Sequence, residues 1–294
     1  NVYLDGRGGI ERDAKQAVYW FQKGADLNSR QCQFNLAACY VRGTGVKADQ
    51  NKALSLYMTA ADFGLPEANI NAALILDNQQ KFKKARYYFS EAADLNDAHA
   101  IRKLAYYYAN GLGGDQDHEK AAMLYMKSAK GGDANAQLKI ADYYNNGKGL
   151  GLSFAESMRW LMLSADNNNS EAQAKLGFCY MSGNLGVKKD STIAFKWFML
   201  AADADFPPAM LAIGNCYATG RAVPFDMQLA FKWYTKAAKF NNRQAIYNIG
   251  VCYARGQGVE IDTIKALDNY KLAAKAQFPE ALYTMGILYL TGEI

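Results

Sequence analysis

The 294-residue sequence has little of what catalysis and metal binding usually require. It contains only two histidines, His99 and His118, and no HExxH, GxSxG, GxGxxG or GxxxxGK[ST] motif. These absences argue against a zinc hydrolase, a serine hydrolase with a nucleophile elbow and a phosphate-binding loop. We therefore expect no catalytic residue, no metal site and no cofactor.

Cysteine is also scarce. The five cysteines form an odd number without a CxxC pair, which fits neither a complete disulfide set nor a zinc ribbon. Four of them, Cys39, Cys179, Cys216 and Cys252, each precede a tyrosine at an equivalent position. We predict that these four are small buried apolar residues.

Charge of one sign and long apolar runs are missing as well. The 33 Lys and Arg residues stand against 28 Asp and Glu residues, and no run of five or more basic residues occurs, so we expect no nucleic-acid partner. No stretch approaches 18 consecutive apolar residues, so we expect no transmembrane segment in this fragment. Because the sequence begins without Met and ends abruptly at Ile294, we interpret it as part of a longer protein.

What the sequence does have is an internal repeat. One marker is a tyrosine that recurs in steps of 36 or 37 residues, apart from one step of 68, at Tyr3, Tyr40, Tyr108, Tyr144, Tyr180, Tyr217, Tyr253 and Tyr289. An independent alanine marker has the same period, with one step of 32, at Ala25, Ala61, Ala93, Ala129, Ala165, Ala202, Ala238 and Ala274. The irregular steps indicate one degenerate unit at 66–96, in which residues 76–82 form a shorter turn. Two markers at one period predict stacked structural units.

Each unit contains two apolar stripes at helical spacing, for example within 242–254 and from 262 onward. Each unit is therefore predicted to be a helical hairpin, with a helix A followed by a helix B. Small residues in the middle of helix A, such as Gly177, Gly214 and Gly250, are expected to let the two helices approach closely.

The loop CYARGQGVEID at 252–262 is one of several copies of the same frame. A glycine three residues after the tyrosine is predicted to close helix A in the left-handed conformation, at Gly43, Gly111, Gly147, Gly183, Gly220 and Gly256. An aspartate is predicted to cap the N-terminus of helix B, at Asp13, Asp49, Asp117, Asp190, Asp226 and Asp262. The glycine-rich loop is thus interpreted as a structural turn rather than a phosphate site.

The frame A-x-x-x-L-G-x-x-Y-x-x-G-x-G-V-x-x-D-x-x-x-A-x-x-W-Y-x-x-A-A resembles the Sel1-like repeat, a relative of the tetratricopeptide repeat, over nearly the whole chain. The resemblance implies an all-α, right-handed α/α superhelical solenoid with the A helices on its concave side. We expect one solenoid over 1–294, made of a partial unit 1–29, full units at about 30–65, 66–96, 97–132, 133–169, 170–206, 207–241 and 242–278, and a lone helix A at 279–294.

The resemblance also implies a non-enzymatic scaffold or adaptor that binds a protein partner through the concave surface. A bacterial envelope or virulence protein that contacts host factors is one form of this role. An adaptor of an endoplasmic-reticulum ubiquitin ligase or of a cell-wall synthase complex is an alternative, and a repeat-based hydrolase or β-lactam-binding protein is another. A cysteine-rich secreted branch of the family, with which β-lactam binding is associated, has one cysteine at the end of helix B and another at the start of the next helix A. Here Cys32 occupies the second position and the first holds alanine, which argues against β-lactam binding. The family favours export, and the cytoplasm and the endoplasmic-reticulum lumen stay open.

Positions of helix A outside the core stripe are expected to face the partner. These candidate binding residues are Phe34, Arg42, Arg102, Lys103, Tyr106, Lys139, Asp142, Lys175, Phe178, Asn215, Tyr247, Asn248, Arg255 and Tyr283. Arg102, Lys103, Lys139 and Lys175 predict a basic strip across three units, and hence an acidic peptide or a free carboxylate as the ligand. Lys139 and Asp142, spaced i,i+3, are expected to form a helix-surface ion pair.

The last helix suggests one more possibility. Tyr283, Ile287 and Leu290 are predicted to share an apolar face there. Terminal faces of repeat arrays need polar caps for solubility, so self-association through these residues is a further expectation.

Overall fold

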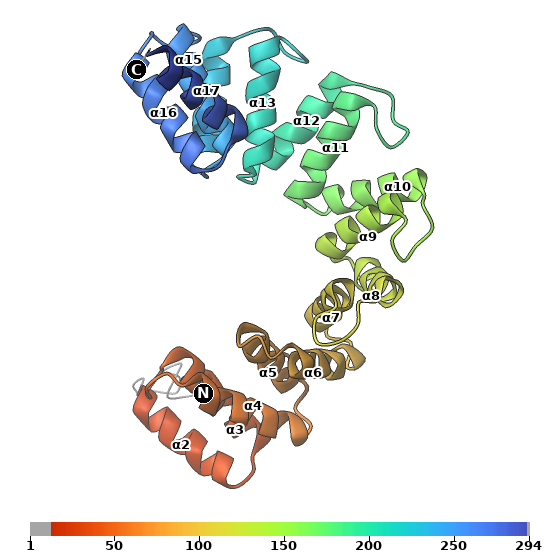
Figure 1. Cartoon of the computed structure of the whole chain (residues 1–294). Coiled ribbons are helices and arrows are strands. Elements are labelled where there is room, and N and C mark those ends of the chain that lie inside the picture. The colour runs from red at the N-terminus through yellow and green to blue at the C-terminus, as the bar shows by residue number, and fades with distance from the viewer. Residues whose placement is uncertain (1–12, 293–294) are drawn as a thin grey trace. The chain divides into compact units, whose positions relative to one another are not determined.

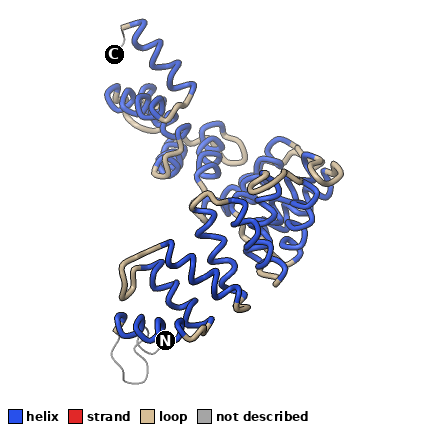
Figure 2. Tube along the Cα trace, turned by 60° about the horizontal axis from the view of Figure 1, so that its bottom comes forward, coloured by secondary structure: helices blue, strands red, loops and turns tan. Residues whose placement is uncertain are grey.

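A computed structural model describes residues 13–292 of the chain. Tyr3, the first repeat marker, and the first residues of the partial unit 1–29 lie outside the described residues. The described part contains sixteen α-helices and no strand (Figure 2). The helices are α2 (Ala14–Asp26), α3 (Arg30–Arg42), α4 (Gln50–Asp62), α5 (Pro66–Asn78), α6 (Phe82–Asp94), α7 (Ala98–Asn110), α8 (His118–Lys130), α9 (Ala134–Asn146), α10 (Phe154–Asp166), α11 (Ser170–Ser182), α12 (Ser191–Asp203), α13 (Pro207–Thr219), α14 (Met227–Ala238), α15 (Arg243–Arg255), α16 (Thr263–Lys275) and α17 (Pro279–Thr291).

Consecutive helices pack as hairpins, as the repeat predicted (Figure 1). From α3 onward the odd-numbered helices are the A helices, and the even-numbered helices are the B helices. Within each unit described below, B helices also pack on the next A helix along the chain, for example α4 on α5 and α14 on α15. This nearest-neighbour packing is that of an all-α solenoid, and the predicted fold class is confirmed.

The contacts between Cα atoms divide the chain into two compact units. The first unit comprises Asn1–Ala136 and Gly147–Gly151, and the second comprises Gln137–Asn146 and Leu152–Ile294. The division of 1–294 into individual repeats stays a prediction.

The predicted helix caps are present. The glycine that ends helix A has a left-handed backbone, with φ of 64° at Gly256, and the same conformation occurs at Gly43, Gly111, Gly147, Gly183 and Gly220. The aspartate before helix B accepts hydrogen bonds from backbone N–H groups, as Asp262 does from Lys265 at 2.9 Å. The same cap forms at Asp13, Asp49, Asp117, Asp190 and Asp226. The loop frame is therefore a pair of helix caps.

The second glycine of the loop has a different role. Gly258 has φ of 74°, and a Cβ added to it would overlap the backbone carbonyl of Met227, at the start of α14 in the preceding repeat. The loop can rest on that helix only because glycine has no side chain. The GxG pattern thus joins neighbouring repeats.

Small residues in helix A also permit close packing inside a hairpin. The ring of Tyr234 in α14 lies against Gly214 in α13, where a Cβ would overlap it. The hydroxyl of Tyr234 donates a 2.9 Å hydrogen bond to Oδ1 of Asn215. Gly177 faces Phe198 and Gly250 faces Tyr270 in the same way. The predicted close approach of the A and B helices is therefore observed.

All five cysteines are free thiols. Cys39, Cys216 and Cys252 are buried, as predicted, and their burial raises the pKa of each thiol. Cys179 is only half-buried, because a surface pocket opens beside it.

Two further features bear on function. No helix within residues 13–292 is long and apolar enough to span a bilayer. In the same residues no group of three or more His, Cys, Asp and Glu side chains is arranged to hold a metal ion.

Candidate functional site

The structure places the predicted binding residues in different environments. Phe34 is half-buried and packs edge-to-face on Tyr57, with ring centroids 5.3 Å apart, so it belongs to the core margin rather than to a free surface. Tyr247 is half-buried between Tyr270 and Phe278. Asn248, which follows Tyr247 in α15, is half-buried too. The exposed members of the set are Arg42, Tyr106, Lys139, Phe178, Arg255 and Tyr283.

Three of the four residues in the predicted basic strip are ion-paired. Nε of Arg102 lies 2.9 Å from Asp133, Nζ of Lys103 lies 3.3 Å from Asp77, and Nζ of Lys175 lies 3.0 Å from Asp142. Each carboxylate comes from a neighbouring repeat. Because these charges are compensated, the strip attracts an anion less than its composition indicated. An acidic partner stays a prediction.

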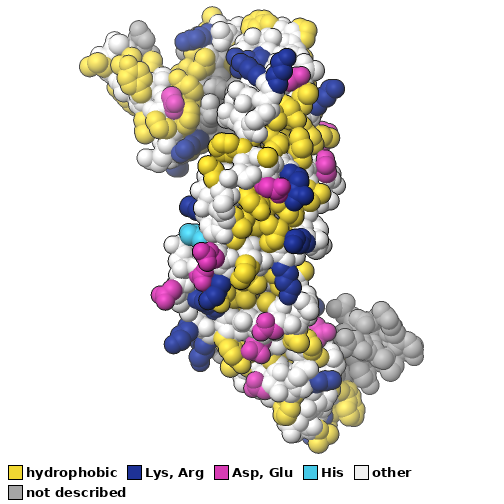
Figure 3. All heavy atoms as spheres, turned by 90° about the vertical axis from the view of Figure 1, so that its right-hand side faces the viewer, with side chains coloured by type: hydrophobic (Ala, Val, Ile, Leu, Met, Phe, Trp, Pro, Cys, Tyr) yellow, Lys and Arg dark blue, Asp and Glu magenta, His cyan; other side chains and the backbone are white. Residues whose placement is uncertain are grey.

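The charge on one face of the molecule is mixed in the same way. On the face in Figure 3, Lys and Arg side chains are interspersed with Asp and Glu side chains and with hydrophobic patches. Such a surface does not form the broad single-sign field that attracts a polyanion.

Asp142 has a different partner from the one predicted. Its carboxylate accepts hydrogen bonds of 3.0 and 3.1 Å from Nζ of Lys175 in α11, rather than pairing with Lys139 on its own helix. Glu171 lies 3.2 Å from the same ammonium group. Burial opposes the charge of Lys175, but the two carboxylates outweigh burial and raise its pKa above the usual value. The expected i,i+3 pair is therefore wrong, and the ion pair connects α9 to α11 instead.

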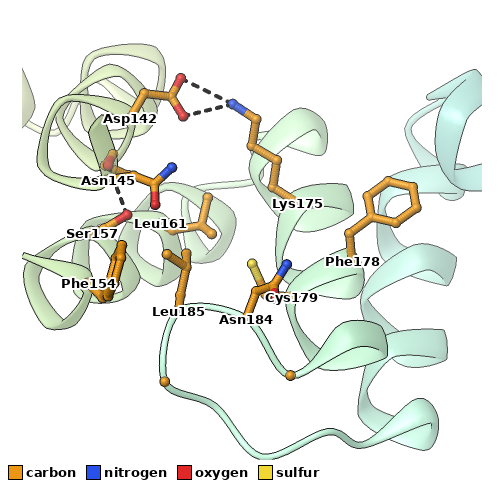
Figure 4. A pocket seen from close by; sticks show the side chains of 13 residues that line it. Asp142, Asn145, Phe154, Ser157, Leu161, Lys175, Phe178, Cys179, Asn184 and Leu185 are labelled. Carbon is orange, nitrogen blue, oxygen red and sulfur yellow. Dashed lines mark hydrogen bonds and ion pairs between the residues drawn. The ribbon is translucent and has the colours of Figure 1, made fainter. Parts of the chain in front are cut away.

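This ion pair stands at the mouth of a pocket of about 590 Å³ in the second unit (Figure 4). Three helices and one loop line it, through Ala141, Asp142 and Asn145 of α9, Phe154, Ser157 and Leu161 of α10, Lys175, Phe178 and Cys179 of α11, and Gly183, Asn184, Leu185 and Gly186 of the loop. The lining is mainly apolar. The hydroxyl of Ser157 is occupied, since it donates a 2.8 Å hydrogen bond to the carbonyl of Ala141.

One loop that lines the pocket is longer than its counterparts within residues 13–292. From the C-cap Gly183 to the N-cap Asp190 the chain has one residue more than from Gly256 to Asp262. Gly186 accordingly does not rest on the preceding repeat as Gly258 does, and nothing lies within 4 Å of the place where its Cβ would be. The space left between this loop and α10 is part of the pocket.

A second, smaller hollow of about 210 Å³ adjoins the pocket. Its lining includes Asn215, Cys216 and Thr219 of α13. Phe178 borders both hollows, is 47% exposed, and packs on Phe198 with ring centroids 4.9 Å apart. The structure thus brings together four of the predicted residues, Asp142, Lys175, Phe178 and Asn215.

The chemistry of these side chains is that of binding. Burial raises the pKa of the Cys179 thiol, although Lys175 partly opposes this, so the thiolate needed of a nucleophile is disfavoured. Burial, followed by the charges of Arg102 and Lys103, lowers the pKa of His99, which lies on α7 in the other unit. No acid–base couple joins these groups in the part of the chain that the structure describes.

Sequence reasoning missed the part of the pocket that α10 and the loop contribute, namely Phe154, Ser157, Leu161, Asn184, Leu185 and Gly186. For the loop residues a signal was present in the step of 37 residues from Tyr180 to Tyr217, which records the extra loop residue and also occurs from Tyr3 to Tyr40. That step indicates a longer loop. Which side chains line the pocket beside it depends on the three-dimensional packing of the helices.

Comparison with known proteins agrees with this architecture. A sequence model of the Sel1 repeat matches residues 1–29, 30–62, 79–97, 98–133, 134–169, 170–206, 207–239 and 243–278. Similar solved structures include a Sel1 repeat protein from Oxalobacter formigenes, which is 28% identical with a TM-score of 0.82 and aligns over 95% of this chain and 82% of its own. Another is c5321, a protective antigen present in uropathogenic Escherichia coli strains and displaying an SLR fold, at 26% identity and a TM-score of 0.71, over 99% of this chain and 70% of its own. With repeats matched along most of its length, the chain belongs to the Sel1 repeat family.

Proposed function

We propose that this protein is a non-enzymatic scaffold that binds a protein partner through the A-helix face of its second unit. We define this face by the residues that the two hollows bring together, Asp142, Lys175, Phe178 and Asn215. The main support is the half-exposed ring of Phe178 between two adjoining hollows, since an aromatic side chain beside apolar pockets is a frequent anchor of protein interfaces. The Sel1 repeat fold, typical of protein–protein interaction, also supports the proposal.

A matched pair of variants tests the proposal. Phe178 and Phe240 are both 47% exposed, and Phe240 lies in the turn after α14, away from both hollows. We expect a partner captured by the wild-type chain to bind Phe178→Ala about tenfold more weakly or worse, and Phe240→Ala with unchanged affinity. The measurement is quantitative affinity capture with mass spectrometry, followed by titration of the purified partner. Equal capture of every partner by both variants would contradict the proposal.

A finer proposal concerns the biological setting. The likeness to c5321, a protective antigen of uropathogenic strains, supports a bacterial envelope or virulence protein that contacts host factors. Labelling of intact, unpermeabilised source cells by an antibody against the chain is the expected result. Labelling only after permeabilisation would favour one of the intracellular adaptor roles.

An enzyme remains the alternative to a scaffold. Turnover of a β-lactam or a glycan that is lost on His99→Ala or Asp142→Asn would favour it. We expect no such turnover, because Asp142 and Lys175 are ion-paired and burial favours the neutral form of the Cys179 thiol.

A further inference from the structure

The pocket beside the long loop contains an unusual backbone conformation. Leu185 has φ of 56°, in the left-handed region that disfavours side chains with a Cβ. Apart from Leu185, the described non-glycine residues with positive φ are Asn28, Gln80, Asn96, Asn168, Asp205, Ala222, Asn241 and Gln277, none of which is large and apolar. Leu185 lines the pocket, and backbone strain of this kind is concentrated at binding sites.

The rim of the pocket carries no free positive charge. Lys175 lies between Asp142 and Glu171, at 3.0 and 3.2 Å, so the two carboxylates outnumber the ammonium group and an anion finds no free counter-charge there. Asn145 and Asn184 complete the rim with exposed amides, which can donate to and accept from a peptide backbone. The rim is therefore complementary to an uncharged polar main chain.

The interior is complementary to an apolar group. Leu161 is buried, and Leu161, Leu185 and Cys179 all line the pocket (Figure 4). Phe154 is 51% exposed at its edge, an arrangement that leaves apolar area in water until something covers it.

We propose that this pocket binds one bulky uncharged apolar side chain, aliphatic or aromatic, from an extended segment of the protein partner. The inference rests on the proposed function and specifies the partner's chemistry at one point. It differs from the acidic ligand that the basic strip suggested, because the ion pairs leave the pocket without net attraction for a carboxylate.

The half-buried thiol of Cys179 allows a test that needs no partner. Methanethiosulfonate reagents carrying a benzyl, a sulfonatoethyl or a trimethylammonioethyl group each form a disulfide with a thiolate and release methanesulfinate. The rate of each reagent is measured at Cys179 and at Cys32 of the wild-type chain by peptide mass spectrometry. Cys32 is the internal control, because it is also half-buried but packs near Gly24 in the first unit.

Comparing the reagents at one thiol cancels the effect of that thiol's pKa. We expect the ratio of the benzyl rate to either charged rate to be about tenfold higher at Cys179 than at Cys32, because the pocket shelters the benzyl group from water. Equal ratios at the two thiols, faster reaction of sulfonatoethyl at Cys179, or no reaction at Cys179 would each overturn the proposal.

A loop variant tests the origin of the pocket. Deletion of Asn184 gives the loop the length of the Gly256–Asp262 loop, and we expect it to reduce the benzyl preference at Cys179 to that of Cys32. If the deletion disrupts folding, Leu185→Asp serves instead, with Leu200→Asp on the exposed surface of α12 as its control. An unchanged benzyl preference in the folded loop variant would show that the loop does not form the site.

The labelling result and the capture result separate the two proposals. A benzyl preference without any partner that depends on Phe178 would retain the apolar pocket and reject the scaffold role. A partner that depends on Phe178, together with equal labelling ratios, would retain the scaffold and reject the apolar pocket.

Discussion

The hydroxyl of Tyr107 donates a 2.6 Å hydrogen bond to Oδ1 of Asp77, thirty residues earlier in the chain. Tyr107 is buried, and Nζ of Lys103 lies 3.3 Å from the other oxygen of the same carboxylate. The three groups connect α5 to α7, next to the shortened connection between α5 and α6. This contact strengthens a part of the array that lacks the usual loop.

The contact predicts a local loss of stability in Tyr107→Phe. Removing the hydroxyl deprives the half-buried Asp77 of a short hydrogen bond, and we expect the free energy of unfolding of the first unit to fall by about 1–3 kcal/mol. Urea denaturation followed by circular dichroism measures the change. The control is Tyr106→Phe, on an exposed neighbour, which should change stability by less than about 0.5 kcal/mol. Equal losses in the two variants would contradict the assignment.

Tyr234 predicts a pH dependence at alkaline pH. Burial raises the pKa of this phenol from 10.0 to about 12. Below pH 10 both the folded and the unfolded states keep the proton, so the stabilisation is fully present there. As the pH rises from 10 towards 12, the unfolded state loses its proton first, and stability falls by an amount on the order of 2 kcal/mol.

Comparison with Tyr234→Phe isolates this contribution from the other groups that titrate at high pH. The wild-type chain should lose more stability than the variant between pH 9 and about 11.5, as measured by thermal unfolding. Parallel pH profiles for the two proteins would show that Tyr234 ionises normally.

The two loop glycines Gly258 and Gly186 predict unequal effects of the same substitution. Both have positive φ, so replacement by alanine costs about 1 kcal/mol at either site. At Gly258 the added methyl group also overlaps the carbonyl of Met227, whereas at Gly186 it meets open space. We expect Gly258→Ala to be the more destabilising variant by at least about 1 kcal/mol in urea denaturation. Similar costs would mean that the loop adjusts without strain.

Helix packing predicts opposite signs for two further glycines. Gly214→Ala would force the ring of Tyr234 away from α13, with an expected cost of about 1–3 kcal/mol. Gly286 lies within α17 with no atom within 4 Å of its Cβ position, so alanine should stabilise that helix by about 0.5–1 kcal/mol. Hydrogen exchange in α13 and α17 gives a separate local measurement for each. Destabilisation of α17 by alanine would contradict the packing described here.

The sequence predicted the fold through features that act locally. These features are the spacing of apolar residues, a left-handed glycine such as Gly256 and a capping aspartate such as Asp262. Each depends on residues only a few positions apart, so helices and their ends can be predicted before the packing is known. Repetition of the frame then predicted the solenoid, because equivalent units pack in equivalent ways.

The site was less predictable because its contacts join different repeats. Asp142 and Lys175 were both expected on the binding face, but their mutual ion pair spans 33 residues and depends on how far each side chain reaches. No feature of the sequence identified Leu185, because its place in the pocket lining depends on the path of the longer loop between Gly183 and Asp190. The ion pairs within the predicted basic strip were not foreseen for the same reason, because the carboxylates that pair with Arg102 and Lys103 lie in other units of the repeat.

The extra residue between Gly183 and Asp190 leaves the flanking helices intact, with thirteen residues in both α11 and α12. A change of one codon in such a loop can therefore reshape the surface beside it without altering the helices around it. Diversity among proteins of this architecture can then arise from loop length at single repeats, in addition to the exchange of surface side chains.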